Sequence, residues 1–216
     1  MNETTHTTRV LELLTQVNAI IPNSHIVYTS GRHGRAYVNK DAIYPHTHIT
    51  SELCRLIAEQ FAEYEIDVVV APALGAILLS QWVAYHLSQT QKKTILAVYA
   101  EKTPEGFTLS RGYDTLCRGK KVLVIEDIIN TGGSLKKVIQ TLRALPAEIV
   151  AAACICNRGE ITTQDLENIP QLYSLSQIKL ESWAAQECPL CEQGISVNTN
   201  VGKGKEFLRS RSQIKN

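Results

Sequence analysis

The chain has 216 residues, and its 22 lysines and arginines against 21 aspartates and glutamates give a formal net charge of +1. Hydrophobic residues make up 44% of the sequence and charged residues 20%, which excludes a disordered chain and suffices for one domain with a proper core. The balanced charge argues against a dedicated nucleic-acid or membrane-surface binder, and six cysteines in no regular frame exclude a disulfide scaffold.

The start of the chain carries no recognisable targeting segment. Residues 1–6 lack the basic start and the apolar stretch of a signal peptide. The longest apolar run, residues 68–79, is too short to span a bilayer, and Pro72 and Gly75 interrupt it. We therefore expect a cytoplasmic protein with reduced thiols.

Apolar residues near the start recur at spacings of three and four, which predicts an amphipathic helix over residues 7–19. Residues 26–44 are rich in Gly, Arg, His and Tyr, which favours short strands and turns. A second repeat at spacings of three and four predicts a helix over residues 49–61.

From residue 66 onward, apolar strands alternate with helices. Strands are predicted at residues 66–71, 94–100, 122–125 and 149–156. Turns are predicted at residues 72–75 and 130–133, and helices at 76–87 and 134–145. Residues 101–119 form a polar segment, and the pattern weakens to a mixed tail after residue 158. This alternation predicts an α/β fold, one domain over residues 1–216 whose parallel sheet is covered on both faces.

The most informative segment follows the strand at residues 122–125, since ligands of such sheets bind beyond the carboxyl ends of the strands. Two carboxylates, Glu126 and Asp127, precede a turn that leads into a helix. Glycines let backbone N–H groups converge on one centre, and a helix N-terminus attracts a phosphate. Carboxylates only accept hydrogen bonds, so they suit ribose hydroxyls or a hydrated Mg²⁺. The pattern predicts a site for a ribose 5-phosphate; the alternative is a plain turn beside solvated acids.

This segment resembles the PRPP-binding signature of the type I phosphoribosyltransferases, where PRPP is 5-phosphoribosyl 1-diphosphate. The resemblance implies that Glu126 and Asp127 contact the ribose hydroxyls of PRPP. It implies that its 5-phosphate is bound by Asn130, Thr131, Gly132, Gly133 and Ser134. Four further segments resemble the orotate phosphoribosyltransferases: residues 30–39, 71–75, 99–102 and 156–160.

The resemblance to the orotate enzymes implies a role for each of these segments. The diphosphate of PRPP would be met by Ala73, Leu74 and Gly75, and by Lys102 and Arg111 of a flexible catalytic loop. The base would be held by Tyr37, Val38, Arg32 and Arg158. Within this set, Asp127 is expected to stabilise positive charge that develops on the ribose.

The resemblance also implies an architecture and an activity. The fold would be a phosphoribosyltransferase-type sheet domain with a small hood, formed by the N- and C-terminal segments, over the base. The enzyme would be a homodimer that uses Mg²⁺ on PRPP. It would transfer the phosphoribosyl group to orotate, giving orotidine 5'-phosphate and diphosphate in pyrimidine biosynthesis. The partners would be these small molecules, with no nucleic acid and no membrane.

Two departures from the orotate enzymes keep alternatives open. Thr29 stands where they usually carry a lysine, and the catalytic loop over residues 101–111 is shorter and has fewer cations. These departures favour transfer to another base as the alternative. A second alternative is a non-catalytic PRPP-sensing regulator, although no helix-turn-helix or strongly basic face is evident in the sequence.

The cysteines allow two interpretations. Cys188 and Cys191 form a C-x-x-C pair, and with Cys154 and Cys156 they could hold zinc tetrahedrally. The simpler hypothesis, reduced structural cysteines, is preferred because no second C-x-x-C pair exists. The basic segment at residues 201–209 is left without a role.

Overall fold

The structure, a computed structural model, describes residues 3–214, and these residues separate into two compact units. The large unit comprises Met1–Leu13 and Tyr44–Ile178, and the small unit comprises Leu14–Ile43 and Lys179–Asn216. Within the described residues, no helix combines the length and the apolar character that crossing a membrane requires.

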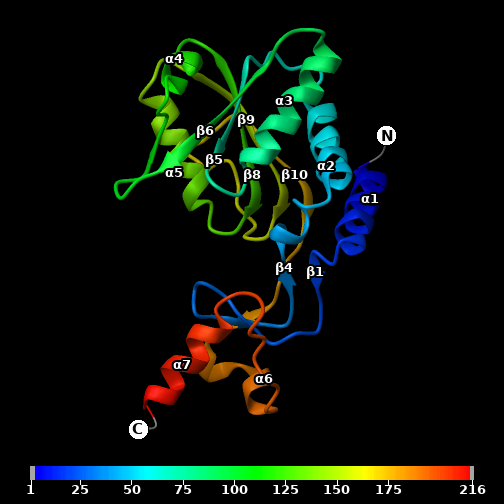
Figure 1. The fold of residues 1–216 in the computed structure, drawn as a ribbon, viewed down its shortest axis with the longest axis vertical. Helices are drawn as coiled ribbons and strands as arrows, with labels where there is room; N and C mark the ends of the chain where they lie inside the picture. The colour runs from blue at the N-terminus through cyan, green and yellow to red at the C-terminus, as the bar shows by residue number, and fades with distance from the viewer. Residues whose placement is uncertain (1–2, 215–216) are drawn as a thin grey trace. The chain divides into compact units, whose positions relative to one another are not determined.

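The large unit is built on one six-stranded sheet in the order β10-β9-β8-β5-β6-β7 (Figure 1). In chain order its strands are β5 (Val68–Pro72), β6 (Leu96–Lys102), β7 (Phe107–Thr108), β8 (Lys121–Ile129), β9 (Glu148–Asn157) and β10 (Leu172–Gln177). Neighbouring strands run parallel except for β7, which pairs antiparallel with β6.

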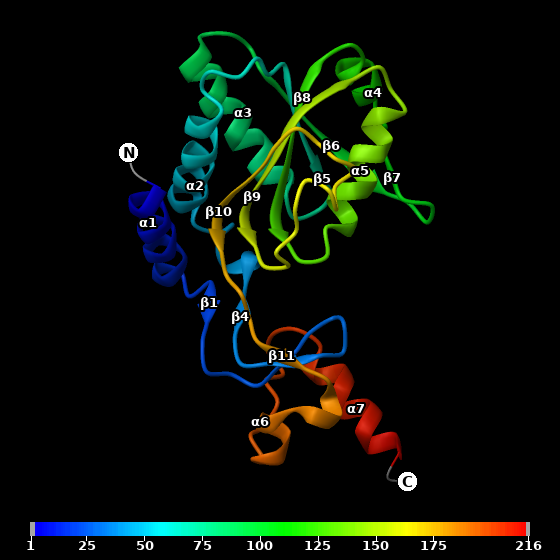
Figure 2. The same cartoon turned by 180° about the vertical axis from the view of Figure 1, so that it is seen from behind.

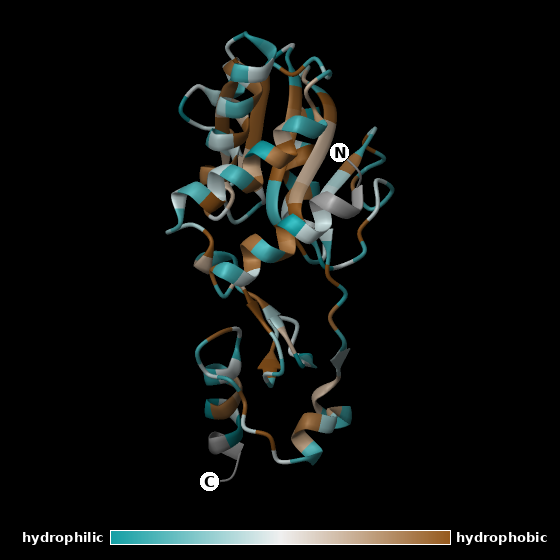
Figure 3. Ribbon diagram, turned by 90° about the vertical axis from the view of Figure 1, so that its right-hand side faces the viewer, coloured by the Kyte–Doolittle hydropathy of each residue, from teal (hydrophilic) through white to brown (hydrophobic). Residues whose placement is uncertain are grey.

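Helices cover both faces of this sheet. They are α1 (Glu3–Gln16), whose last residues belong to the small unit, α2 (Thr47–Gln60), α3 (Ile77–Gln91), α4 (Tyr113–Cys117) and α5 (Gly133–Arg143). Helices α2 and α3 pack on one face and α5 on the other, as the front and back views show (Figures 1 and 2). Polar residues gather on the outer sides of the helices, while the strands are largely apolar (Figure 3).

The core lies between the sheet and its helices. Val68, Val122 and Val124 in the central strands are fully buried, because parallel strands are covered on both faces. On α5, Leu135, Val138, Ile139 and Leu142 recur at helical spacing and pack into the same cluster. Each such side chain contributes about 1.5–3 kcal/mol through burial, which fixes α5 and the loop that precedes it.

The order of the strands creates a switch point between β5 and β8, which lie side by side in the sheet. After β5 the chain crosses through α3 to β6, and after β8 it crosses through α5 to β9 on the other side. Right-handed crossovers in opposite directions place their helices on opposite faces. The segments that follow β5 and β8 therefore diverge, and a switch point of this kind is where ligands of such sheets bind.

The predicted α/β fold is confirmed, with differences in three places. Strand β8 extends beyond residues 122–125, because Ile128 and Ile129 resume the apolar pattern and pair with β9. The polar segment at residues 101–119 contains β7 and α4, which are too short to show a periodicity. The mixed tail contains β10, which pairs parallel with β9 and adds a strand at the edge of the sheet.

The small unit has little regular structure. It contains two small sheets. In one, β1 (Ile20–Ile21) pairs with β4 (Tyr37–Val38). In the other, β3 (His33–Gly34) lies between β2 (Ile26–Val27) and β11 (Ser182–Trp183). Its helices are η1 (Lys40–Ala42), η2 (Ala185–Glu187), α6 (Pro189–Glu192) and α7 (Gly204–Ile214). It thus joins two stretches of chain that are far apart in the sequence.

Candidate active site at the ends of the central strands

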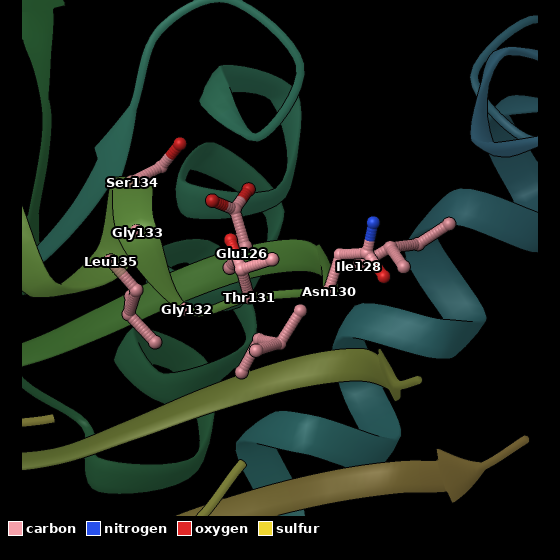
Figure 4. A pocket seen from close by; sticks show the side chains of 9 residues that line it. Glu126, Ile128, Asn130, Thr131, Gly132, Gly133, Ser134 and Leu135 are labelled. Atoms are coloured by element: carbon pink, nitrogen blue, oxygen red, sulfur yellow. The ribbon is translucent and has the colours of Figure 1, made fainter. Parts of the chain in front are cut away.

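The loop between β8 and α5 borders a cavity of about 90 Å³. Its lining residues come from the end of β8, the loop and the first turn of α5: Glu126, Ile128, Ile129, Asn130, Thr131, Gly132, Gly133, Ser134 and Leu135. In Figure 4 the side chains of Glu126 and Ser134 extend to the same side of this loop. The structure therefore brings the predicted phosphate-binding residues together around one hollow.

The backbone of this loop offers donors to a ligand. Among the described residues, the N–H groups from Thr131 to Ser134 donate to no acceptor of the protein itself. Gly132 has a φ of +72°, a conformation that a side chain would strain, and it turns the chain into α5. Free N–H groups at the N-terminus of an eleven-residue helix form a site suited to an anion.

The two acids do not lie together at the end of the strand, as the sequence suggested, but inside it. Exposure alternates along the end of β8, with Glu126 and Ile128 half-buried and Asp127 buried. Successive side chains of a strand point to opposite faces. Glu126 accordingly borders the cavity, whereas Asp127 is not among its lining residues.

Asp127 is held by partners that the sequence did not indicate. Its Oδ2 accepts a hydrogen bond of 2.8 Å from the hydroxyl of Tyr44, and its Oδ1 accepts one of 2.6 Å from the N–H of Ile128. Tyr44 lies 83 residues earlier, just before α2, and carries no motif that would have identified it. The carboxylate of Asp127 is only 3% exposed, so these bonds fix its orientation.

The second predicted loop, Ala73–Gly75, follows β5 across the switch point. The N–H of Ala73 donates to the carbonyl of Ala100 on β6 at 2.8 Å, which ties the loop to the sheet. The peptide bond between Ala73 and Leu74 is cis, and the side chain of Leu74 is 84% exposed. Because β5 neighbours β8, this loop and the loop of residues 130–134 leave adjacent strands.

Lys102 and Arg111 belong to a short hairpin formed by β6 and β7. Lys102 ends β6 with an exposed side chain, opposite Phe107. Arg111 donates from Nη2 to the Oε1 of Glu101 at 2.9 Å, and Ser110 also bonds this carboxylate. The Ser110 hydroxyl, and next the guanidinium of Arg111, hold the pKa of the Glu101 carboxyl below its usual range. Arg111 is thus held to its own hairpin, and Lys102 projects from it.

Arg158 is connected directly to the loop before α5. Its Nε donates to the side-chain oxygen of Asn130 at 3.1 Å, and its N–H donates to the carbonyl of Ile129 at 2.8 Å. Next to it, Gly159 approaches so closely that a Cβ would lie 1.6 Å from the carbonyl oxygen of Asn130. The loops after β8 and β9 therefore pack backbone to backbone, and Gly159 is a site residue that the sequence pattern did not single out.

The other predicted base-binding residues belong to the small unit. Tyr37 is half-buried in β4, and Val38 is 3% exposed and pairs with Ile20. Arg32 is exposed, and its guanidinium donates to the side chain and the carbonyl of Ser182. Their proposed contact with a base stays a prediction.

The four cysteines considered for zinc do not form one group in the described part of the chain. Cys154 and Cys156 lie buried in β9 of the large unit, where burial raises the pKa of both thiols and keeps them protonated. Cys188 and Cys191 belong to the small unit, and the metal-ligating side chains beside them are two histidines. All six cysteines are free.

Comparison with known proteins identifies relatives of this arrangement. Residues 39–189 match the family model described as a phosphoribosyl transferase domain. A protein of Caldanaerobacter subterraneus subsp. tengcongensis named orotate phosphoribosyltransferase is 31% identical over 187 residues, covering 87% of this chain and 93% of the relative.

Solved structures with a similar fold include two with different names. The orotate phosphoribosyltransferase of Mycobacterium tuberculosis superimposes with a TM-score of 0.63 at 20% identity, over 80% of this chain and 96% of that chain. An adenine phosphoribosyltransferase of Thermoanaerobacter pseudethanolicus gives a TM-score of 0.59 at 15% identity, over 78% and 99%. At these identities the likeness shows the fold alone.

The close packing of Gly159 against Asn130 generates a prediction. Replacing Gly159 with alanine should destabilise the protein by about 1–3 kcal/mol, because the new Cβ overlaps a backbone carbonyl. Gly133→Ala in the same pair of loops is the matched control, since its Cβ would meet only Thr131 Oγ1 at an ordinary 3.5 Å. The measurement is urea-induced unfolding, and equal stability of the two variants would contradict the packing described here.

Proposed function

This chain belongs to the phosphoribosyltransferase family, and from that membership we propose that it transfers the phosphoribosyl group of PRPP to orotate. The diphosphate leaves C1 of the ribose, and a ring nitrogen of orotate forms the new bond to C1. The observation that carries the proposal is the loop of free N–H groups beside Glu126 at the switch point. The relative named orotate phosphoribosyltransferase, aligned over 87% of the chain, supports the choice of the base.

The 5-phosphate of PRPP would bind at the loop before α5. The N–H groups from Thr131 to Ser134 and the hydroxyls of Thr131 and Ser134 supply donors to its oxygens. The side chain of Asn130 is held by Arg158, whose positive charge adds to the attraction. This binding energy anchors the ribose so that its C1 meets the base in a fixed orientation.

The two acids would act on the ribose in different ways. Glu126 borders the cavity and would accept hydrogen bonds from the ribose hydroxyls. Asp127, buried and oriented by Tyr44, would place a fixed negative charge near the ribose as positive charge develops on it. Tyr44 would then be a positioning residue, because it acts through Asp127.

The diphosphate would face Ala73–Gly75 and the hairpin that carries Lys102. Small residues in the first segment permit close approach of the backbone, and the exposed ammonium of Lys102 can reach developing negative charge. The carboxylate of Glu126 and the oxygens of PRPP are hard ligands of the kind that Mg²⁺ accepts. Bound to the diphosphate, Mg²⁺ would neutralise the leaving group. Arg111 would contribute once released from Glu101.

Arg158 is proposed to bind the base. A guanidinium pairs well with a carboxylate, which orotate carries and most nucleobases lack. Tyr37, Val38 and Arg32 are proposed to complete this side as the hood over the base. Thr29, in place of a lysine, favours the alternative that a base without a carboxylate is used. A homodimer, which the family resemblance implies, and the cytoplasmic location expected in the sequence analysis are part of the same proposal.

The direct test is an assay with PRPP, Mg²⁺ and a panel of bases that includes orotate, uracil, adenine and hypoxanthine. We expect release of diphosphate with orotate alone. Release with another base but not with orotate would replace the proposed substrate. Binding of PRPP without release from any base would favour a regulator over an enzyme.

Replacing Asp127 with asparagine should reduce kcat about 100-fold or more, because the fixed negative charge near the ribose is lost. The fold should persist, since an amide oxygen can still accept the hydrogen bond from Tyr44. The control is Asp114→Asn in the first turn of α4, a carboxylate that does not line the cavity. Steady-state kinetics and circular dichroism check both variants, and an unchanged kcat for Asp127→Asn would defeat the assigned role.

Replacing Lys102 with alanine should lower kcat about 10- to 100-fold while the KM for PRPP changes much less. The reason is that the ammonium meets charge that grows only as the diphosphate departs. Lys137→Ala on the exposed side of α5 is the matched control. A variant whose KM rises at unchanged kcat would instead show that Lys102 binds PRPP without assisting its cleavage.

A further inference from the structure

Two histidines and two cysteines converge in the small unit, outside the site described above. The group consists of His25, His33, Cys188 and Cys191, and their ligand atoms all lie within 4.8 Å of one another. We propose that these four side chains bind a zinc ion that joins the two halves of the small unit.

The distances between the ligand atoms suit one central ion. Nε2 of His25 lies 3.6 Å from Sγ of Cys188 and 3.7 Å from Sγ of Cys191. Nδ1 of His33 lies 3.4 Å from Sγ of Cys191. A tetrahedral zinc ion with bonds of 2.0–2.3 Å separates its ligands by about 3.3–3.8 Å. The two ring nitrogens, now 2.9 Å apart, need to separate by only a few tenths of an ångström.

The surroundings of His25 prepare its Nε2 for a metal. Its Nδ1 lies 2.6 Å from the carbonyl oxygen of Ile195. A carbonyl can only accept, so Nδ1 carries the proton and, in the neutral ring, Nε2 presents its lone pair to the group. A hydrogen bond from the second ring nitrogen to a carbonyl is the usual support of a metal-binding histidine.

Three of the four proposed ligands are almost completely shielded from water. Among the described residues, His25, His33 and Cys188 are at most 2% exposed. Two thiolates also balance the charge of Zn²⁺, so the buried site is neutral as a whole.

Hydrogen bonds alone leave this group poorly satisfied. Within the described residues, Nε2 of His33 is buried without a hydrogen-bond partner, and the ring stands edge-on to Phe207 of α7 at 4.7 Å between centroids. Thiols are weak hydrogen-bond donors and acceptors, so hydrogen bonds among the two rings and the two thiols stabilise the group only weakly. A zinc ion would instead accept one lone pair from each of the four ligand atoms and form a bond to each.

The ligand set favours zinc and a structural role. Two sulfurs and two nitrogens in a tetrahedral set are typical of zinc. All four positions would be filled by the protein, which leaves no open position for a substrate or a water molecule. The site is therefore distinct from any Mg²⁺ that accompanies PRPP.

The position of the ligands explains what the ion would contribute. His25 and Cys188 are 163 residues apart, and the large unit lies between them in the sequence. The small unit has about 70 residues and strands of only two residues each, a size at which a metal or disulfides usually supplement the core. A shared ion would hold the two segments together by closing this long loop.

The test starts from the metal content of the full-length protein, purified under reducing conditions and measured by inductively coupled plasma mass spectrometry. We expect about one zinc per chain. In Cys188→Ser and Cys191→Ser the content should fall at least tenfold, whereas Cys154→Ser and Cys117→Ser should keep it. Zinc retained by the first pair, or lost from the second pair, would overturn the assignment of the ligands.

A second measurement uses the wild-type protein, so it tests the proposal even where the variants fold poorly. Wild-type protein stripped with a chelator and loaded with Co²⁺ should show the visible absorption of tetrahedral cobalt and a thiolate-to-cobalt band. Zinc should displace both and raise the melting temperature by several degrees. No cobalt spectrum and no thermal shift, or a disulfide between Cys188 and Cys191 in the reduced preparation, would overturn the proposal. These readouts do not depend on orotate or PRPP, so they fail or succeed separately from the proposed activity.

Discussion

The divergence of the chain after two neighbouring parallel strands is the constraint on which the active-site geometry depends. Because β5 continues into α3 on one face and β8 into α5 on the other, the segments that follow the two strands leave the sheet in different directions. The backbone donors of the loop before α5 therefore stay available to a ligand. The apolar face of α5 supplies the burial energy that keeps this exposed loop in place.

Close packing around the loop before α5 explains how a segment without helix or strand structure keeps its charged and polar side chains in fixed positions. Gly159 brings the segment after β9 against the carbonyl of Asn130, and Arg158 bonds the side chain of the same residue. On the opposite face of β8, Tyr44 orients Asp127. The two faces of β8 therefore carry different groups: Glu126 borders the cavity, and Asp127 is buried in the interior. This division follows from the alternation of side chains along a strand.

The two units of the chain are stabilised in different ways. The large unit buries continuous apolar strands beneath helices, and the cysteines within β9 are part of that core. The small unit has strands of only two residues each, and it draws on segments from both ends of the chain. The proposed zinc site lies where such a unit most needs a cross-link, and it uses side chains from both segments.

The sequence by itself determined the α/β class, the strands β5, β6, β8 and β9, the helices α1, α2, α3 and α5, and the turn before α5, because each depends on local periodicity or on adjacent residues. Glycine pairs and apolar runs act over a few residues, so their consequences can be foreseen without the fold. Tertiary structure alone decided which distant residues meet: Tyr44 with Asp127, 83 residues apart, and His25 with Cys188, 163 apart. It also decided that the zinc candidates pair with histidines and not with the cysteines of β9. The path of the chain in three dimensions brings these residues together, and that path leaves no periodic trace in the sequence.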